Sequence, residues 1–146
     1  MGELEGVQPD LVRLVQRAIV RTPQDFTVHD GLRELEEQRE YLRRGVSRTL
    51  LSMHLPQDDG YGHAVDLVPY INGRLRWEWL PIYEIFKTVR QIANEMELPV
   101  RWGGCWQLVG DTGDTDPHTL VEAYMQRKRD MGKRYFVDGP HYELVI

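Results

Sequence analysis

The sequence predicts an α+β fold in which a small antiparallel sheet is backed by helices. Amphipathic stretches with helical spacing occur near the N-terminus, in the middle and in the last third of the chain. Short segments rich in branched residues lie between them, in the order helices, strands, a long helix, a strand, a helix and a strand. The length of 146 residues is that of one domain, expected over 1–146, with a buried core.

The N-terminal third is predicted to hold two helices and a strand. Pro9 and Asp10 are start signals for a helix over residues 9–20, whose apolar face is formed by Leu11, Leu14, Val15 and Ala18. Residues 25–31 (DFTVHDG) indicate a short strand that ends in a turn. Residues 32–45 are predicted to form a second, mostly solvated helix.

The rest of the chain is predicted to alternate strands with two helices. Residues 52–68 indicate two short strands around a loop, followed by an Asn-Gly turn. Residues 80–98 have the strongest helical pattern, and 100–109 indicate a strand with a glycine break. A helix over 116–132 is expected to be capped by Asp116, and two short strand pieces are expected in the tail, around a Gly-Pro turn.

Composition and charge exclude several classes. The formal net charge of −5 argues against a nucleic-acid binder, and the single cysteine cannot form an internal disulfide. We find no secretory signal and no run of membrane-spanning length, so we expect a monomer in the cytoplasm with no membrane partner. Action elsewhere would require another factor to release it.

One carboxylate and one histidine lie where burial is expected. Asp66 stands between Val65 and Leu67, and His141 stands close to the apolar C-terminus. A buried carboxylate is costly unless it is paired or binds a metal, and histidine with carboxylate is the ligand chemistry of zinc. We therefore expect both residues in a metal site.

The second histidine ligand has two candidates. His63 lies three residues before Asp66, so in an extended strand it would point to the opposite face. His54 belongs to the preceding strand and could face Asp66 across a hairpin. We expect His54 as the ligand, with His63 a wall residue that remains its rival. Asp138, across a turn from His141, has the position of a general base.

These residues resemble a known family of zinc peptidases. The S-x-H … G-x-A-x-D pattern, the later D-x-x-H pattern and the strand Trp-Gly-Gly-x-Trp at 102–106 are similar to the D-alanyl-D-alanine carboxypeptidase family, which has a hedgehog-like fold. Within it, the chain looks closest to L-alanyl-D-glutamate endopeptidases used as phage endolysins. Gly31, Arg33 and Gln38 also match an upstream motif of the family.

The resemblance implies a function and a site. The function would be cleavage of the L-Ala–D-Glu bond of the peptidoglycan stem peptide during host-cell lysis, in a single catalytic domain without a separate wall-binding domain. Zinc would be held by His54, Asp66 and His141, with Asp138 as base. Arg33 would bind a substrate carboxylate or stabilise the oxyanion, and Ser52 and Gln38 would contact the substrate.

Two departures from the family pattern accompany the resemblance. Eleven residues separate His54 from Asp66, more than is usual, and an additional segment over 107–137 is expected to edge the substrate cleft. The Asp- and Gly-rich loops also raise a calcium-binding hypothesis. Two rival functions remain, namely a cellular D,D-carboxypeptidase or dipeptidase, and a non-catalytic wall-binding or virion module on the same fold.

Overall fold

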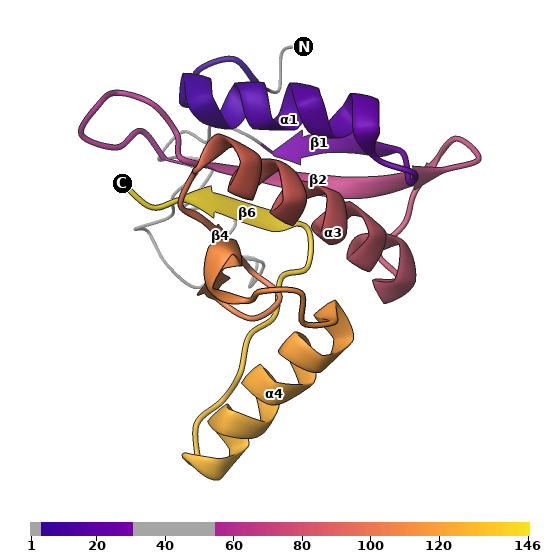
Figure 1. Cartoon of the computed structure of the whole chain (residues 1–146), viewed down its shortest axis with the longest axis vertical. Coiled ribbons are helices and arrows are strands. Elements are labelled where there is room, and N and C mark those ends of the chain that lie inside the picture. Colours follow the sequence, from indigo (N-terminus) through magenta and orange to yellow (C-terminus); the bar gives the residue numbers. More distant parts are fainter. Residues whose placement is uncertain (1–3, 31–54) are drawn as a thin grey trace, which may run out of the picture.

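The computed structural model of the chain describes residues 4–30 and 55–146, which form one layer of helices against an antiparallel sheet (Figure 1). The helices are α1 (Pro9–Arg21), α3 (Trp79–Met96) and α4 (Pro117–Asp130), with a short 3₁₀ turn η2 (Val109–Asp111). The strands are β1 (Phe26–Asp30), β2 (Ala64–Ile71), β3 (Arg74–Leu75), β4 (Val100–Trp102), β5 (Gln107–Leu108) and β6 (His141–Leu144).

The strand order is β1-β2-β6-β4-β5, with β3 paired to β2, and the described pairings are antiparallel. The C-terminal strand β6 therefore lies in the middle of the sheet, between β2 and β4. This order confirms the predicted α+β class. It also brings the tail of the chain beside a strand that is distant in sequence.

Helices α1 and α3 pack side by side on one face of the sheet (Figure 1). Their apolar stripes join the inward residues of the strands in one hydrophobic core, with Trp102 and Phe86 stacked at 4.0 Å between ring centroids. Helix α4 extends away from this body and contributes only one side of its first three turns to the core, through Leu120, Val121 and Tyr124. Among the described helices, none is both long and apolar enough to cross a membrane.

Local signals in the sequence account for the helix ends. The side chain of Asp116 accepts hydrogen bonds from the backbone N–H groups of His118 and Thr119, which confirms the predicted cap of α4. Helix α1 begins at Pro9, as predicted, and is capped by the residue before it, because Oε1 of Gln8 accepts hydrogen bonds from the N–H groups of Asp10 and Leu11. Asn72 and Gly73 both have positive φ, as the predicted hairpin turn between β2 and β3 requires.

The tail differs from the expectation of two strand pieces, because only β6 is a strand. The middle of the segment 133–138 is held instead by side chains: Trp106 Nε1 donates a hydrogen bond to the backbone oxygen of Phe136 (2.7 Å), and the hydroxyl of Tyr124 donates to the same oxygen (3.2 Å). The branched and aromatic residues of this segment thus pack against neighbours without a strand partner. The predicted helix at 32–45 lies outside the described residues.

Candidate metal centre

Three side chains with metal-ligating atoms meet where β2 and β6 pair. Asp66 and His141 are directly opposed across the two strands, and Nδ1 of His141 lies 3.3 Å from Oδ1 of Asp66. Asp138 lies in the turn that precedes β6. One donor atom from each of the three residues lies within 4.8 Å of the other two.

Strand alternation places this cluster on the face of the sheet away from α1 and α3. Val65 and Leu67 of β2 and Tyr142 of β6 belong to the hydrophobic core. Because successive side chains of a strand point to opposite faces, Asp66 and His141 point to the other face. Apolar packing on one face therefore fixes the two strands whose other face carries the polar cluster.

The turn that carries Asp138 is tied to the end of β4 by backbone hydrogen bonds. The N–H of Asp138 donates to the oxygen of Gly103 (2.9 Å), and the N–H of Gly103 donates to the oxygen of His141 (2.9 Å). Trp102 Nε1 donates to the oxygen of Gly139 (2.7 Å). A Cβ atom on Gly103 would overlap the backbone oxygen of Asp138 and approach the Cβ of His141, so the close approach requires glycine.

The second ring nitrogen of His141 has its own carboxylate partner. Nε2 of His141 lies 2.8 Å from Oε1 of Glu143, two residues along the same strand. The other carboxylate oxygen of Glu143 accepts a hydrogen bond from the guanidinium of Arg101 on β4 (3.2 Å). Metal-bound histidines commonly donate their other N–H to such a carboxylate, which fixes the ring and its tautomer. Nδ1 is therefore the nitrogen that is turned toward Asp66.

Charge in this cluster shifts two pKa values. Burial by itself would lower the pKa of His141, but hydrogen bonds to Asp66 and Glu143 and the charges of Asp66 and Asp138 raise it to about 10. Burial would raise the pKa of Glu143, but the contacts with His141 and Arg101 lower it. Without a metal, the geometry thus favours an imidazolium between carboxylates. A cation fits the same position.

The donor set suits a zinc ion. One imidazole nitrogen and carboxylate oxygens are ligands that zinc accepts, at distances of about 2.0–2.2 Å. Two such ligands at neighbouring corners of a tetrahedron are separated by about 3.3–3.5 Å. The separation of 3.3 Å between Nδ1 of His141 and Oδ1 of Asp66 agrees with that value.

The structure brings together three of the residues singled out from the sequence, Asp66, Asp138 and His141. Arg33, Gln38, Ser52 and His54 lie outside the described residues. His63, the rival ligand, is buried apart from the cluster, and its Nε2 lies 2.8 Å from Oδ2 of Asp59 in the preceding loop. That loop is closed by the paired residues Pro56 and Gly62. His63 is therefore bound to this loop.

Trp106, the last residue of the Trp-Gly-Gly-x-Trp segment, packs against the core and is also a neighbour of the site. Its ring lies 5.4 Å from that of His141 and 6.2 Å from that of Phe136, measured between centroids, and it is only half-buried. Trp106 also has a φ of 58°, a conformation that few side chains adopt. The sequence feature that could have placed Trp106 near the site is its position at the end of the Trp-Gly-Gly-x-Trp segment, directly after the turn that approaches Asp138.

An imidazole and two carboxylates that converge on the polar face of an antiparallel sheet have the chemistry of a metal-dependent hydrolase. The chain belongs to the phage L-alanyl-D-glutamate peptidase family, whose profile matches residues 1–145. The family and the fold class expected from the sequence are thereby confirmed. The expectations that the chain is a peptidase of peptidoglycan and that it acts on an L-Ala–D-Glu bond are confirmed as well.

Two relatives support this membership. The chain is 29% identical to the L-alanyl-D-glutamate peptidase of Escherichia phage T5 over 147 residues, which are 98% of this chain and 92% of the phage protein. It also resembles the crystal structure of the Serratia marcescens L-Ala D-Glu endopeptidase ChiX, with a TM-score of 0.69 and 34% identity. That match covers 99% of this chain and 84% of the other.

Proposed function

We propose that this chain is a zinc-dependent endopeptidase that cleaves the L-Ala–D-Glu bond of the peptidoglycan stem peptide and so lyses the host cell. The observation that carries the proposal is the convergence of Asp66, Asp138 and His141 within 4.8 Å, in a member of this peptidase family. Calcium binding by the Asp- and Gly-rich loops stays a separate prediction.

Zinc would be held by His54, Asp66 and His141. When bound, it would supply a Lewis acid that polarises the scissile carbonyl and makes a water molecule more acidic. The carboxylate of Asp66 and Nδ1 of His141 are already oriented toward one another. Glu143 would keep Nε2 of His141 protonated, so that Nδ1 offers its lone pair.

Asp138 would serve as the general base. A base must reach the proton that it removes, and Asp138 lies beside the proposed ligands on a turn that hydrogen bonds to Gly103 fix in place. It would accept the proton of the attacking water and deliver it to the leaving amine of D-Glu. Arg33 would bind the D-Glu carboxylate through paired hydrogen bonds, and Ser52 and Gln38 would line the substrate.

Digestion of purified peptidoglycan tests the reaction and the metal together. The protein is incubated with sacculi, with or without a chelator, and with zinc restored after chelation, and the soluble products are analysed by mass spectrometry. New L-Ala carboxyl ends and D-Glu amino ends are expected, lost with the chelator and regained with zinc. Release of terminal D-Ala would instead identify a carboxypeptidase, and binding to sacculi without cleavage would identify a non-catalytic module.

The proposed site of action is the cell wall, reached from the host cytoplasm once the membrane has been permeabilised. The absence of a membrane-spanning helix among the described residues is compatible with release by a separate factor. Expression in the cytoplasm, with and without an added membrane-permeabilising agent, tests this order. Lysis is expected only when the protein and the permeabilising agent are both present.

A further inference from the structure

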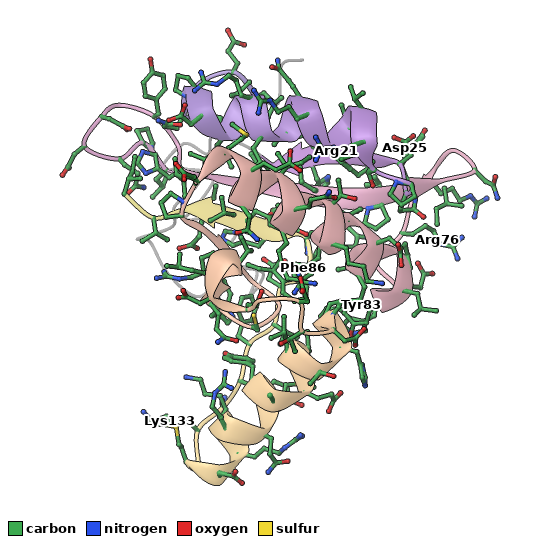
Figure 2. The ribbon with its side chains drawn as sticks, viewed as in Figure 1. Arg21, Asp25, Arg76, Tyr83, Phe86 and Lys133 are labelled. Carbon is green, nitrogen blue, oxygen red and sulfur yellow. The ribbon has the colours of Figure 1, made fainter. Side chains whose placement is uncertain are left out.

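The end of α4 carries a concentration of positive charge in an acidic protein. Residues 127–134 (RKRDMGKR) contain five cations and one carboxylate, although the formal net charge of the chain is −5. We call residues 127–136, which end α4 and begin the return segment, the basic tip. Lys133 lies at the outer end of this projection and points away from the body of the protein (Figure 2).

Within the described residues, no carboxylate neutralises the cations of the basic tip. Arg127, Lys128, Arg129, Lys133 and Arg134 form no ion pair with the part of the chain that the structure describes. The one carboxylate there, Asp130, instead accepts a hydrogen bond from the side chain of Gln126 (2.8 Å). Over the described residues, the tip therefore carries positive charge that no neighbouring carboxylate offsets.

Stabilisation of the helix explains only part of this charge. Arg127, Lys128 and Arg129 lie in the last turn of α4, where cations interact favourably with the helix dipole. Lys133 and Arg134 lie beyond the last helical residue, Asp130, and have no such role. Both are exposed. Their charge needs another explanation.

Large apolar side chains are exposed among these cations. Met131 is 59% exposed, Tyr135 is 40% exposed and Phe136 is 36% exposed. The guanidinium of Arg129 lies 5.7 Å from the ring centroid of Tyr135, so the charged and aromatic groups share one surface. Cations interleaved with exposed methionine and aromatic rings fit an interface where headgroups meet hydrocarbon.

We propose that the basic tip docks the protein on an anionic lipid surface. The cations would contact the negatively charged headgroups while Met131 and Tyr135 enter the outermost apolar layer. This departs from the sequence-based expectation of no membrane partner, although contact with a membrane surface needs no spanning helix. The proposal does not depend on the peptidase chemistry, because none of the five cations belongs to the metal cluster and the outer end of α4 projects away from β2 and β6 (Figure 1).

Vesicle co-sedimentation of the full-length protein tests this docking. Vesicles of phosphatidylglycerol with phosphatidylethanolamine are compared with vesicles of phosphatidylcholine, at about 0.1 M salt, where charges are screened beyond about 10 Å. Binding to the anionic vesicles alone is expected, weakening as salt is raised. The double variant K133Q/R134Q should bind about 25-fold more weakly, since each cation near such a surface contributes about fivefold. M131S should also weaken binding, without changing its salt dependence.

A charge-matched control separates the effect of the cations at the tip from the effect of the protein's net charge. Arg17 on α1 and Arg74 on β3 are exposed, so R17Q/R74Q removes the same two charges elsewhere and should bind as the parent does. Circular dichroism checks that each variant is folded. Equal binding by K133Q/R134Q and the parent, equal binding to phosphatidylcholine, or K133Q/R134Q-sensitive binding to purified sacculi alone would each overturn the proposal. None of these results bears on cleavage of sacculi.

Discussion

Nε2 of His141 lies 2.8 Å from Oε1 of Glu143, while Nδ1 of the same ring faces Asp66 at 3.3 Å. Both carboxylates lie on the face of the sheet that His141 shares, because Asp66 is its cross-strand partner and Glu143 is two residues along β6. One imidazole is thus oriented from both sides. The first prediction below tests whether Glu143 positions the ligand.

Glu143→Ala should weaken zinc binding by about 10- to 100-fold, the usual cost of losing the partner that orients a metal-bound histidine. Glu143→Gln retains an oxygen that can accept a hydrogen bond from the N–H of His141, so this variant should lose less zinc affinity. Competition with a chromophoric chelator measures both affinities. Glu122→Ala, an exposed change on α4, is the control. If the Ala and Gln variants bound zinc as tightly as the parent, Glu143 would have no positioning role.

Asp138→Asn and Asp66→Asn should separate the base from the ligands. Asp138→Asn is expected to keep its zinc and lose about 10²–10⁴-fold in kcat, because general-base catalysis contributes about that factor. Asp66→Asn is expected to lose the metal together with activity. Zinc content by atomic spectroscopy and cleavage of sacculi are measured on the same samples. Loss of zinc from Asp138→Asn would make Asp138 a ligand, which its distance from the other two donors permits.

The metal-free protein should lose stability as pH rises. The pKa of His141 is raised from 6.5 to about 10, so the folded state holds its proton more tightly than the unfolded state does. This stabilisation is complete below pH 6.5 and is lost as pH rises through about 10, with a slope of at most about 1.4 kcal/mol per pH unit from this group. Urea unfolding of the protein, freed of metal by a chelator, measures the free energy of unfolding at several pH values.

His141→Gln is the control for this pH dependence. The variant lacks the titrating imidazole, whereas the other ionisable groups are unchanged. Its free energy of unfolding should therefore fall less steeply with pH between 6.5 and 10 than that of the parent. Parallel curves for the two proteins would mean that His141 does not carry the dependence.

Gly103→Ala should damage the site as well as the fold. The new Cβ would overlap the backbone oxygen of Asp138, and relief would require the turn to move away from β4. We expect a loss of about 1–3 kcal/mol in the free energy of unfolding, as in other overpacked sites, together with weaker zinc binding. Gly110→Ala is the matched control, because its Cβ would meet only Oδ1 of Asn94 at 3.4 Å. Equal effects of the two changes would show that the approach at Gly103 is not critical.

Much of the secondary structure could be predicted because its signals are local. The apolar stripe of α3, the cap at Asp116 and the Asn72-Gly73 turn each depend on residues within a few positions of one another. The tail was mispredicted over 133–138, where strand-forming residues have no strand partner and are held by Trp106 and Tyr124. Whether such a segment becomes a strand depends on neighbours that its own sequence does not specify.

The sequence by itself determined which residue types were available for chemistry, because a carboxylate at position 66 and a histidine at position 141 stand in apolar segments where an isolated polar group is costly. Only the tertiary structure decided that β6 inserts between β2 and β4, so that Asp66 faces His141 directly and Gly103 admits the turn of Asp138. It also placed Trp106 beside the site. Local periodicity encodes elements, whereas strand order and register come from the packing of the whole core.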